Sequence, residues 1–209
     1  MATTLHDAPA RGSARLLLLD AAVKVIRTKG LNATTVDELC ATAGVTKGAF
    51  FHHFPSKEAL AIAAAHHWSE TTGALFAAAS YHDLPDPVDR IFGYLELRAQ
   101  LIVGEPADYT CLVGTMTQEA FDTSPAVRDA CAASIFGHAG TLEADFAQAL
   151  EARHVDPAVT ATSLARHTQA VLQGAFILSK AADDPTVVVD GISHLRRYFE
   201  YLFHQGVDE

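Results

Sequence analysis

The chain has 209 residues, of which 49% are hydrophobic and 19% are charged, and its formal net charge is −10. This composition is typical of a globular protein with a sizeable core and excludes an intrinsically disordered chain. A membrane span needs about 18 consecutive apolar residues, and Leu16–Leu19 is too short for the core of a signal peptide, so we expect a cytoplasmic protein. The three cysteines, Cys40, Cys111 and Cys131, are odd in number and far apart, which argues against a disulfide scaffold.

The charge is distributed unevenly along the chain. Residues 1–57 hold seven Lys and Arg against four Asp and Glu, giving +3, whereas residues 58–209 hold eight against twenty-one, giving −13. A basic N-terminal part on an acidic remainder suits a protein that addresses phosphates with one end only. An excess of +3 over 57 residues is also within ordinary scatter, so charge alone leaves nucleic-acid binding open.

The pattern of helix starts predicts an all-α fold. Asp or Ser directly before Pro, a favoured pair at the first turn of a helix, occurs at Asp86-Pro87, Ser124-Pro125, Asp156-Pro157 and Asp184-Pro185. Each pair precedes a long stretch rich in helix formers, and period-2 alternation is nearly absent. We therefore expect no strand and nine helices, over residues 11–29, 35–42, 46–52, 56–80, 86–105, 108–121, 124–152, 157–182 and 185–204.

Residues 16–60 contain three short predicted helices whose spacing is informative. Gly30 ends the first helix in the manner of a left-handed cap, and Thr35 and Glu38 form a capping box that opens the second. A turn containing Gly44 follows, and Thr46 caps the third helix. Two short helices joined by a turn of about 3–4 residues with a glycine are the helix-turn-helix pattern.

Residues 35–60 read TVDELCATAGVTKGAFFHHFPSKEAL. They contain an Ala-Gly-Val-Thr-Lys-Gly turn, an aromatic-rich third helix and the Phe-Pro-Ser-Lys-Glu-Ala-Leu opening of a fourth. This stretch resembles the DNA-binding domain of the TetR family of bacterial transcription regulators. The resemblance implies a nine-helix all-α regulator with a three-helix DNA-binding domain over residues 1–57. Residues 58–209 would then form a ligand-binding and dimerisation domain, and the protein would be neither an enzyme nor dependent on a cofactor.

The resemblance also implies which residues contact DNA: Thr35, Thr46, Lys47, Gly48, Ala49, Phe51, His52, His53 and Lys57. Residues 47–49 would face base edges and the others the DNA backbone, with Lys57 aided by the dipole of the fourth helix. A capping role alone explains the two threonines equally well. Phe51 departs from the family pattern, which commonly has Tyr there, so it can pack against DNA but cannot donate a hydrogen bond to phosphate. Neighbouring histidines point about 100° apart on a helix, so no metal site is expected at His52 and His53.

The C-terminal part carries weaker signals. In this family the last two helices form a four-helix bundle between two subunits, so we expect a homodimer through Leu172, Phe176, Ile192, Leu195 and Phe199, although an internal core explains part of these apolar faces. A mostly apolar ligand pocket is expected among the preceding helices. Its candidate residues are Trp68, Phe76, Phe92, Tyr94, Tyr109, Cys111, Met116, Phe136, His138, His167 and Gln173, each of which could equally be core.

The sequence therefore predicts a dimeric repressor that binds a palindromic operator in double-stranded DNA and is released by a small-molecule inducer. Residues 109–116 resemble a segment of one subgroup of these regulators in which a cysteine reacts with electrophiles or oxidants, so a thiol sensor at Cys111 is one alternative. A helical ligand carrier or enzyme is another, but phosphate-binding, zinc-protease and hydrolase motifs are missing from the sequence. Activation in place of repression stays open.

Overall fold

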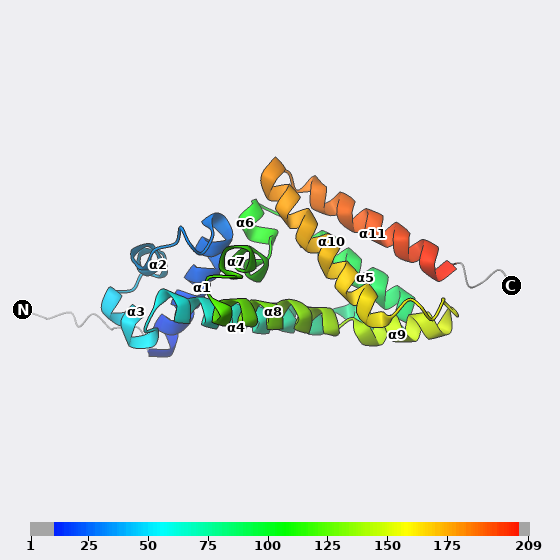
Figure 1. The fold of residues 1–209 in the computed structure, drawn as a ribbon, viewed down its shortest axis with the longest axis horizontal. Helices are drawn as coiled ribbons and strands as arrows, with labels where there is room; N and C mark the ends of the chain where they lie inside the picture. The colour runs from blue at the N-terminus through cyan, green and yellow to red at the C-terminus, as the bar shows by residue number, and fades with distance from the viewer. Residues whose placement is uncertain (1–10, 205–209) are drawn as a thin grey trace, which may run out of the picture.

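The computed structural model describes residues 11–204, and this part of the chain is all-helical, as predicted. Figure 1 shows α1–α3 together at one end, α4 and α8 side by side along the length of the molecule, and α5, α9, α10 and α11 toward the other end. None of the helices within residues 11–204 is both long and apolar enough to cross a membrane. The elements are α1 (Arg11–Lys29), α2 (Val36–Ala43), α3 (Lys47–His53), α4 (Lys57–Ala77), the 3₁₀ helix η1 (Ser80–Asp83), α5 (Pro87–Gln100), α6 (Pro106–Tyr109), α7 (Leu112–Ala120), α8 (Pro125–Gly140), α9 (Glu143–Ala152), α10 (Ala161–Ala182) and α11 (Thr186–His204).

Five helices begin directly after a predicted capping residue. Thr35, Thr46 and Ser56 each accept a hydrogen bond from the backbone N–H three residues further on, at 3.0–3.2 Å. Asp86 accepts the Val88 N–H at the start of α5 and Ser124 accepts the Val127 N–H at the start of α8, each beside a proline at the first helical position. Each of these side chains satisfies a donor that the first turn of a helix leaves without a backbone partner.

Several predicted helices are wrong in extent. Residues 108–121 and 124–152 are each divided in two, so the described part of the chain has eleven α-helices where nine were expected for the whole. Cys111 is the N-cap of α7 and its Sγ accepts the Gly114 N–H at 3.4 Å, while a turn at residues 141 and 142 separates α8 from α9. The helix expected to reach residue 105 ends at Gln100, before Gly104 takes a left-handed conformation with φ of 89°.

The predicted start at Asp156-Pro157 is also wrong. The Asp156 carboxylate accepts the Ala158 N–H at 2.8 Å and so closes a turn outside any helix. The helix α10 begins four residues later than expected, after Thr160, whose hydroxyl accepts the Ser163 N–H at 3.2 Å. An Asp followed by Pro thus marks a turn as readily as a helix start, because the same side-chain bond serves both.

Buried side chains form two hydrophobic cores. The first joins α1–α3 to α4, α7 and α8, and it includes Leu18, Phe50, Leu60 and Met116. The second lies among α5, α9, α10 and α11 and the C-terminal end of α8. The first core therefore contains residues from both sides of the domain boundary predicted at residue 57, and α1, on which α2 and α3 pack, contacts α4, α6 and α7 directly.

The five residues predicted for dimerisation lie inside the protomer, which corrects that part of the expectation. Leu172, Phe176, Ile192, Leu195 and Phe199 are all buried in the second core, where α10 and α11 pack on each other and on α5 and α9. Their apolar faces are covered by the protomer's own helices, so a partner is not needed to bury them. The large apolar side chains left exposed on α8, α10 and α11 are a different set: Phe136, Ile177, Leu178, Val189, Tyr198 and Tyr201.

Candidate DNA-binding and ligand-binding sites

The α2-turn-α3 unit is held by local contacts. Gly44 ends α2 in a left-handed conformation with φ of 66°, which a residue with a Cβ adopts only at a cost. The predicted capping box at the start of α2 forms only in half. Thr35 accepts the Glu38 N–H as expected, but the Glu38 carboxylate pairs with Lys29 at 2.5 Å and so ties α2 to α1.

One face of α3 is exposed and carries four of the residues predicted to contact DNA. Lys47, Gly48, Phe51 and His52 are exposed, and their spacing places them on the same side of the helix. Phe50 points the other way into the first core and is fully buried. The buried ring therefore anchors α3 while its opposite side stays free to approach a groove of DNA.

The remaining predicted contacts differ in their surroundings. Thr35 and Thr46 are exposed at the N-termini of α2 and α3, and Ala49 and His53 are half-buried. The Lys47 ammonium forms an exposed ion pair with Asp37 at 2.5 Å, a partner that a phosphate can replace.

Lys57 lies differently from its prediction. Its Nζ donates to the carbonyl oxygens of Leu31 and Thr34, both at 2.9 Å, and to that of Asn32 at 3.4 Å. The ammonium therefore closes the loop between α1 and α2 instead of pointing outward from α4. We correct its expected role from a phosphate contact to a structural tie.

Hydrogen bonds link the end of α1 and the loop after it to helices later in the chain. The Arg27 Nε in α1 donates to the Thr110 carbonyl at 2.7 Å, and Lys180 in α10 donates to the Arg27 carbonyl at 3.1 Å. The Glu119 carboxylate accepts the Asn32 N–H at 2.8 Å. The C-terminal end of α1 is thereby fastened to α6, α7 and α10, so a change in those helices reaches the DNA-binding end directly.

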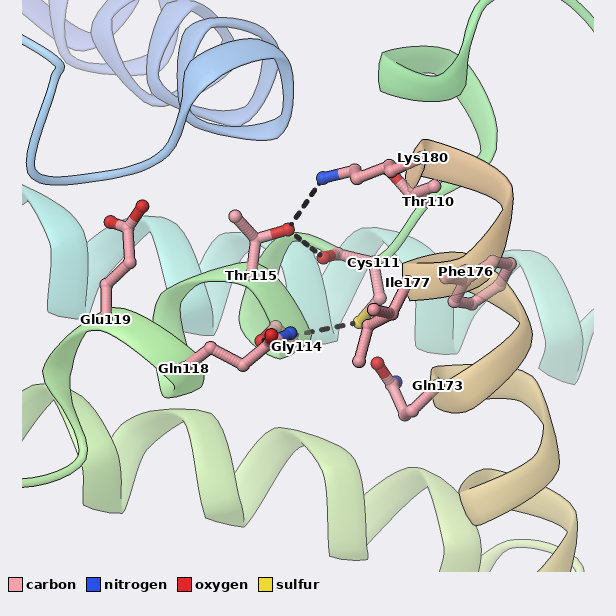
Figure 2. A pocket seen from close by; sticks show the side chains of 10 residues that line it. All are labelled: Thr110, Cys111, Gly114, Thr115, Gln118, Glu119, Gln173, Phe176, Ile177 and Lys180. Atoms are coloured by element: carbon pink, nitrogen blue, oxygen red, sulfur yellow. Dashed lines mark hydrogen bonds between the residues drawn. The ribbon is translucent and has the colours of Figure 1, made fainter. Parts of the chain in front are cut away.

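Two cavities lie among the helices of the C-terminal part. The first, which we call the Cys111 cavity, has a volume of about 190 Å³ and lies between α7 and α10. Figure 2 shows Lys180 reaching across it from α10 to the Thr115 hydroxyl, at 3.0 Å, with the Cys111 thiol and Gln173 close together below. Phe176 lines it as well, although the sequence predicted that residue for the dimer interface.

The second cavity, which we call the central cavity, consists of two lobes of about 280 and 50 Å³ that share five lining residues. Its walls come from α1, α4, α5, α6, α7, α8 and α10, and its larger lobe has the more apolar lining. The shared residues are Trp68, Thr72, Arg98, Tyr109 and Phe176.

Some predicted pocket residues line these cavities and others do not. Trp68, Phe76, Tyr109, Cys111, His138 and Gln173 line one or both cavities. Met116 is instead fully buried in the first core, and Phe92 lies beneath the Arg196 guanidinium at 4.7 Å. Phe136 and His167 are exposed on the outside of the protomer. Those four residues do not line these two cavities, and neither does Tyr94, which is buried in the second core. Arg27, Arg98 and Lys180, which were not among the predicted residues, do line them.

A hydrogen-bonded cluster lies beside the central cavity. Arg98 donates to the Tyr94 hydroxyl at 2.8 Å and to His138 Nε2 at 2.6 Å, and Tyr94 OH lies 3.1 Å from the same nitrogen. A guanidinium can only donate, so His138 accepts at Nε2 and is neutral, with its proton on Nδ1. Burial, and secondarily the charge of Arg98, lower the pKa of His138 to about 3, which agrees with the neutral form.

The three cysteines lie in unlike surroundings. Cys40 and Cys131 are buried in the first core, and burial raises the pKa of both thiols, that of Cys131 to about 11. Cys111 is half-buried, lines both cavities and stands at the N-terminus of α7. It is the cysteine that a small molecule in either cavity would meet.

Comparison with known proteins identifies the chain's family. Residues 18–64 match the model described as "Bacterial regulatory proteins, tetR family", and residues 87–195 match the one described as "Tetracyclin repressor-like, C-terminal domain". The second match alone covers more than half of the chain. The chain belongs to the TetR family. It is a transcriptional regulator with a helix-turn-helix DNA-binding domain, and members of this family bind DNA, form dimers and are not enzymes.

Relatives in sequence match over about a quarter of the chain. Over 54 residues the chain is 39% identical to the HTH-type transcriptional repressor KstR2 of Rhodococcus jostii, and the match covers 26% of each chain. Over 56 residues it is 38% identical to the uncharacterized HTH-type transcriptional regulator YuxN of Bacillus subtilis, covering 27% of this chain and 19% of the relative. The match thus spans about a fifth to a quarter of these relatives' length, and their activities as whole proteins do not carry over.

Solved structures match along nearly the whole chain. A TetR-family transcriptional regulator from Agrobacterium tumefaciens superposes with a TM-score of 0.80 at 18% identity, covering 93% of this chain and 100% of that one. A TetR regulator from Chloroflexus aurantiacus gives 0.77 at 25% identity, covering 91% and 96%. The reduced form of NemR from Escherichia coli gives 0.72 at 23%, covering 88% and 96%. The TetR-like fold predicted from the helix-turn-helix segment is therefore confirmed for the full architecture.

Proposed function

We propose that this chain is a repressor that binds an inverted-repeat operator as a homodimer, in the cytoplasm, and releases it when a small molecule occupies its cavities. The observation that carries the proposal is the exposed face of α3, with Lys47, Gly48, Phe51 and His52 on one side and the buried Phe50 behind them. Phosphate contacts from the capping residues Thr35 and Thr46 and from Lys47 would position α3, while residues 47–49 would read base edges.

The dimer is supported by the apolar surface that the protomer leaves uncovered. Ile177, Leu178, Val189, Tyr198 and Tyr201 lie on α10 and α11, and Leu178 and Tyr201 are 60% and 66% exposed. A group of large apolar side chains on one pair of helices marks an interaction surface. A twofold dimer through this surface would place two copies of α3 in successive major grooves, about 34 Å apart or a multiple of that.

Release of the operator follows from the contacts of α1 and α4. Both helices line the central cavity, through Arg27 and Trp68, and both contribute to the first core, in which α1 packs on α2 and α3. A ligand that binds better to a conformer with differently spaced recognition helices shifts the population toward it. To change the ratio of released to DNA-binding conformer from 1:99 to 99:1, the ligand must bind the released conformer more tightly than the DNA-binding conformer by about 5.5 kcal/mol.

A footprint on the intergenic DNA upstream of the gene tests the proposal. We expect protection of an inverted repeat whose half-site centres are about 10 base pairs, or a multiple of that, apart, with affinity that falls steeply as salt rises. Gly48→Ala and Lys47→Met should weaken the protection, whereas Arg128→Gln, an exposed change on α8, should not. Binding that is independent of sequence and unaffected by all three changes would contradict the proposal.

A second candidate function is thiol sensing, favoured by the position of Cys111. Its Sγ stands at a helix N-terminus and lines a cavity that the Lys180 side chain also lines. Alkylation of the native protein should modify Cys111 before Cys40 and Cys131, and Cys111→Ser should abolish the response of DNA binding to electrophiles. If DNA is released by electrophiles while Cys111 stays unmodified, this candidate fails.

A further inference from the structure

The central cavity carries positive charge inside a strongly acidic part of the chain. Its lining includes two cations, Arg27 and Arg98, against a single carboxylate, Asp108. Residues 58–209, by contrast, have a formal charge of −13. Carboxylates are thus abundant in this part of the chain, yet the cavity has fewer of them than it has arginines.

The two arginines differ in how their charge is compensated. Asp108 lies in the same lobe as Arg27 and interacts electrostatically with it, while its Oδ2 also accepts the Glu105 N–H at 3.0 Å. Among residues 11–204, Arg98 has no carboxylate within ion-pair distance. Its partners are the Tyr94 hydroxyl, the neutral His138 and an aromatic ring face 4.3 Å from the guanidinium carbon. A half-buried cation held only by neutral groups retains its attraction for an anion.

Most of the remaining lining of the larger lobe is apolar, with Thr71, Thr72 and the Tyr109 hydroxyl as its other polar groups. Trp68, Leu75, Phe76, Leu101, Ile102 and Leu172 line it, and Leu75 and Leu101 remain partly exposed at the surface. Its volume of about 280 Å³ stands at the lower end of the range of small-molecule sites, which is about 300–1,000 Å³. The occupant that this lining fits is a small molecule with an apolar body and one negative group.

We propose that the central cavity binds a small organic acid, with the carboxylate on the Arg98 guanidinium and the aliphatic or aromatic body against the wall of α4 and α10. This inference rests on the proposed function and names the chemical class of its inducer. A carboxylate accepts two parallel hydrogen bonds from a guanidinium, and the bond is stronger away from bulk water.

Arg27 gives this ligand a route to the DNA-binding end. Its guanidinium lies 4.8 Å from the centre of the Trp68 ring in the cavity wall, and it belongs to α1, which packs on α2 and α3. A ligand body that moves the Trp68 ring also moves the Arg27 guanidinium that lies over it, and so competes with the bond from Arg27 Nε to the Thr110 carbonyl. Occupancy of the cavity thus acts on the contact that fastens α1 to α6.

Paired ligands that differ only in charge test the proposal. Octanoate and octanamide, and 2-naphthoate and 2-naphthamide, are titrated into the full chain by calorimetry. Trp68 is the only tryptophan, so its fluorescence reports entry of the octyl pair into the cavity. We expect at least one acid to bind tenfold or more tightly than its amide. Arg98→Gln should remove this preference, Arg98→Lys should restore part of it, and the surface control Arg128→Gln should retain it in full.

The outcomes separate this inference from the proposed function. If each amide binds as tightly as its acid, or if neither acid binds at 1 mM, an order-of-magnitude limit for a specific site, the inference is wrong. The circular dichroism melting curve of Arg98→Gln shows whether the variant folds. If it does not fold, the difference in affinity between acid and amide for the unmodified chain decides whether the cavity prefers an acid. Operator binding by the unmodified chain without any acid tests the proposed function independently.

Discussion

The helix-turn-helix end and the cavity end of this protein differ in how far apart in sequence their decisive contacts lie. In the α2-turn-α3 unit, Thr35 and Thr46 cap their helices through bonds to N–H groups three residues away, and Gly44 makes the turn by its own conformation. In the central cavity, Arg98 meets His138 across 40 residues and Gln169 meets Tyr94 across 75. Local contacts build the part that would read DNA, and long-range contacts build the part that would sense a ligand.

The two ends are nevertheless joined in one packing unit. The first core includes Phe50 from α3 together with Met116 from α7, and α1 is bonded to α6 and α10 through Arg27 and Lys180. The recognition helix is therefore recognisable from its sequence alone but is positioned by helices that are distant in sequence. A ligand at those helices therefore needs no separate transmitting element.

The largest effect is expected where the recognition helix meets the core. Phe50→Ala should lower the free energy of unfolding by about 3–5 kcal/mol, because it leaves a cavity in the first core. Its neighbour Phe51 is 56% exposed, so Phe51→Ala should change stability by no more than about 0.5 kcal/mol while weakening DNA binding. Urea unfolding of both variants measures the difference. Similar losses for the two would show that α3 is not anchored as described.

A second prediction concerns pH and the cavity end. Unfolding returns the pKa of His138 from about 3 to its ordinary value of 6.5, so the unfolded chain binds a proton in this window that the folded chain does not. The contribution of His138 to stability is therefore complete above pH 6.5 and is lost as the pH falls toward 3. From pH 7 to pH 5 the free energy of unfolding should drop by about 2 kcal/mol on this account.

The matched variants for this prediction are two histidine replacements. His138→Gln keeps an acceptor for Arg98 and should flatten the dependence of stability on pH. His167→Gln changes an exposed histidine and should leave the dependence as it is in the unmodified chain. Urea unfolding at pH 5, 6 and 7 measures both slopes, and equal slopes for the two variants would show that His138 is not held neutral.

A third prediction compares Lys57, which has a structural role, with Lys47, which is expected to face DNA. Lys57→Met should destabilise the chain by about 1–2 kcal/mol, because three carbonyl groups of the loop after α1 lose their shared donor. Lys47→Met removes an exposed ion pair and should leave the melting temperature unchanged while reducing operator affinity and its salt dependence. Thermal unfolding and fluorescence anisotropy with operator DNA measure the two effects. The reverse pattern would return Lys57 to the phosphate-contact role that its sequence position predicts.

At Gly48 a substitution is expected to affect DNA binding without loss of stability. A Cβ there would lie 3.7 Å from the Thr46 hydroxyl, an ordinary contact, and alanine favours helix by up to about 1 kcal/mol relative to glycine. Gly48→Ala should therefore fold at least as well as the unmodified chain and still lose about tenfold in operator affinity, because the added methyl group keeps α3 from the groove. Unchanged operator affinity would mean that this face does not approach the bases.

Much of the fold could be predicted from the sequence because caps and turn glycines act over three or four residues. The start of α2, the start of α3 and the proline-marked starts of α5 and α8 follow from such signals. The division of residues 124–152 could not be predicted in this way. The turn at residues 141 and 142 has no side-chain cap, and Leu142 is buried by helices distant in sequence.

The candidate sites, too, could be predicted from the sequence only where their contacts are local. An exposed face of α3 follows from its short amphipathic pattern, but the surroundings of Lys57 depend on a loop 23–26 residues earlier. Arg98 was missed because an arginine on an amphipathic helix predicts a solvated position. Its place in the cavity depends on Phe76 from α4 and His138 from α8, neither of which is near it in sequence. Phe176 and Leu172 were assigned to a dimer interface because an apolar helix face does not show which neighbour covers it.

Changing the spacing between the operator half-sites tests most directly whether the protein binds DNA as a twofold dimer. Five base pairs inserted between the two half-sites of the footprinted sequence rotate one half-site by about half a turn, since a turn of DNA has about 10 base pairs. If a dimer presents two copies of α3 to successive grooves, fluorescence anisotropy should show operator affinity falling to the level of unrelated DNA, and insertion of a full turn should leave it higher than insertion of half a turn. Equal affinity for the original and the five-base-pair operators would contradict the account.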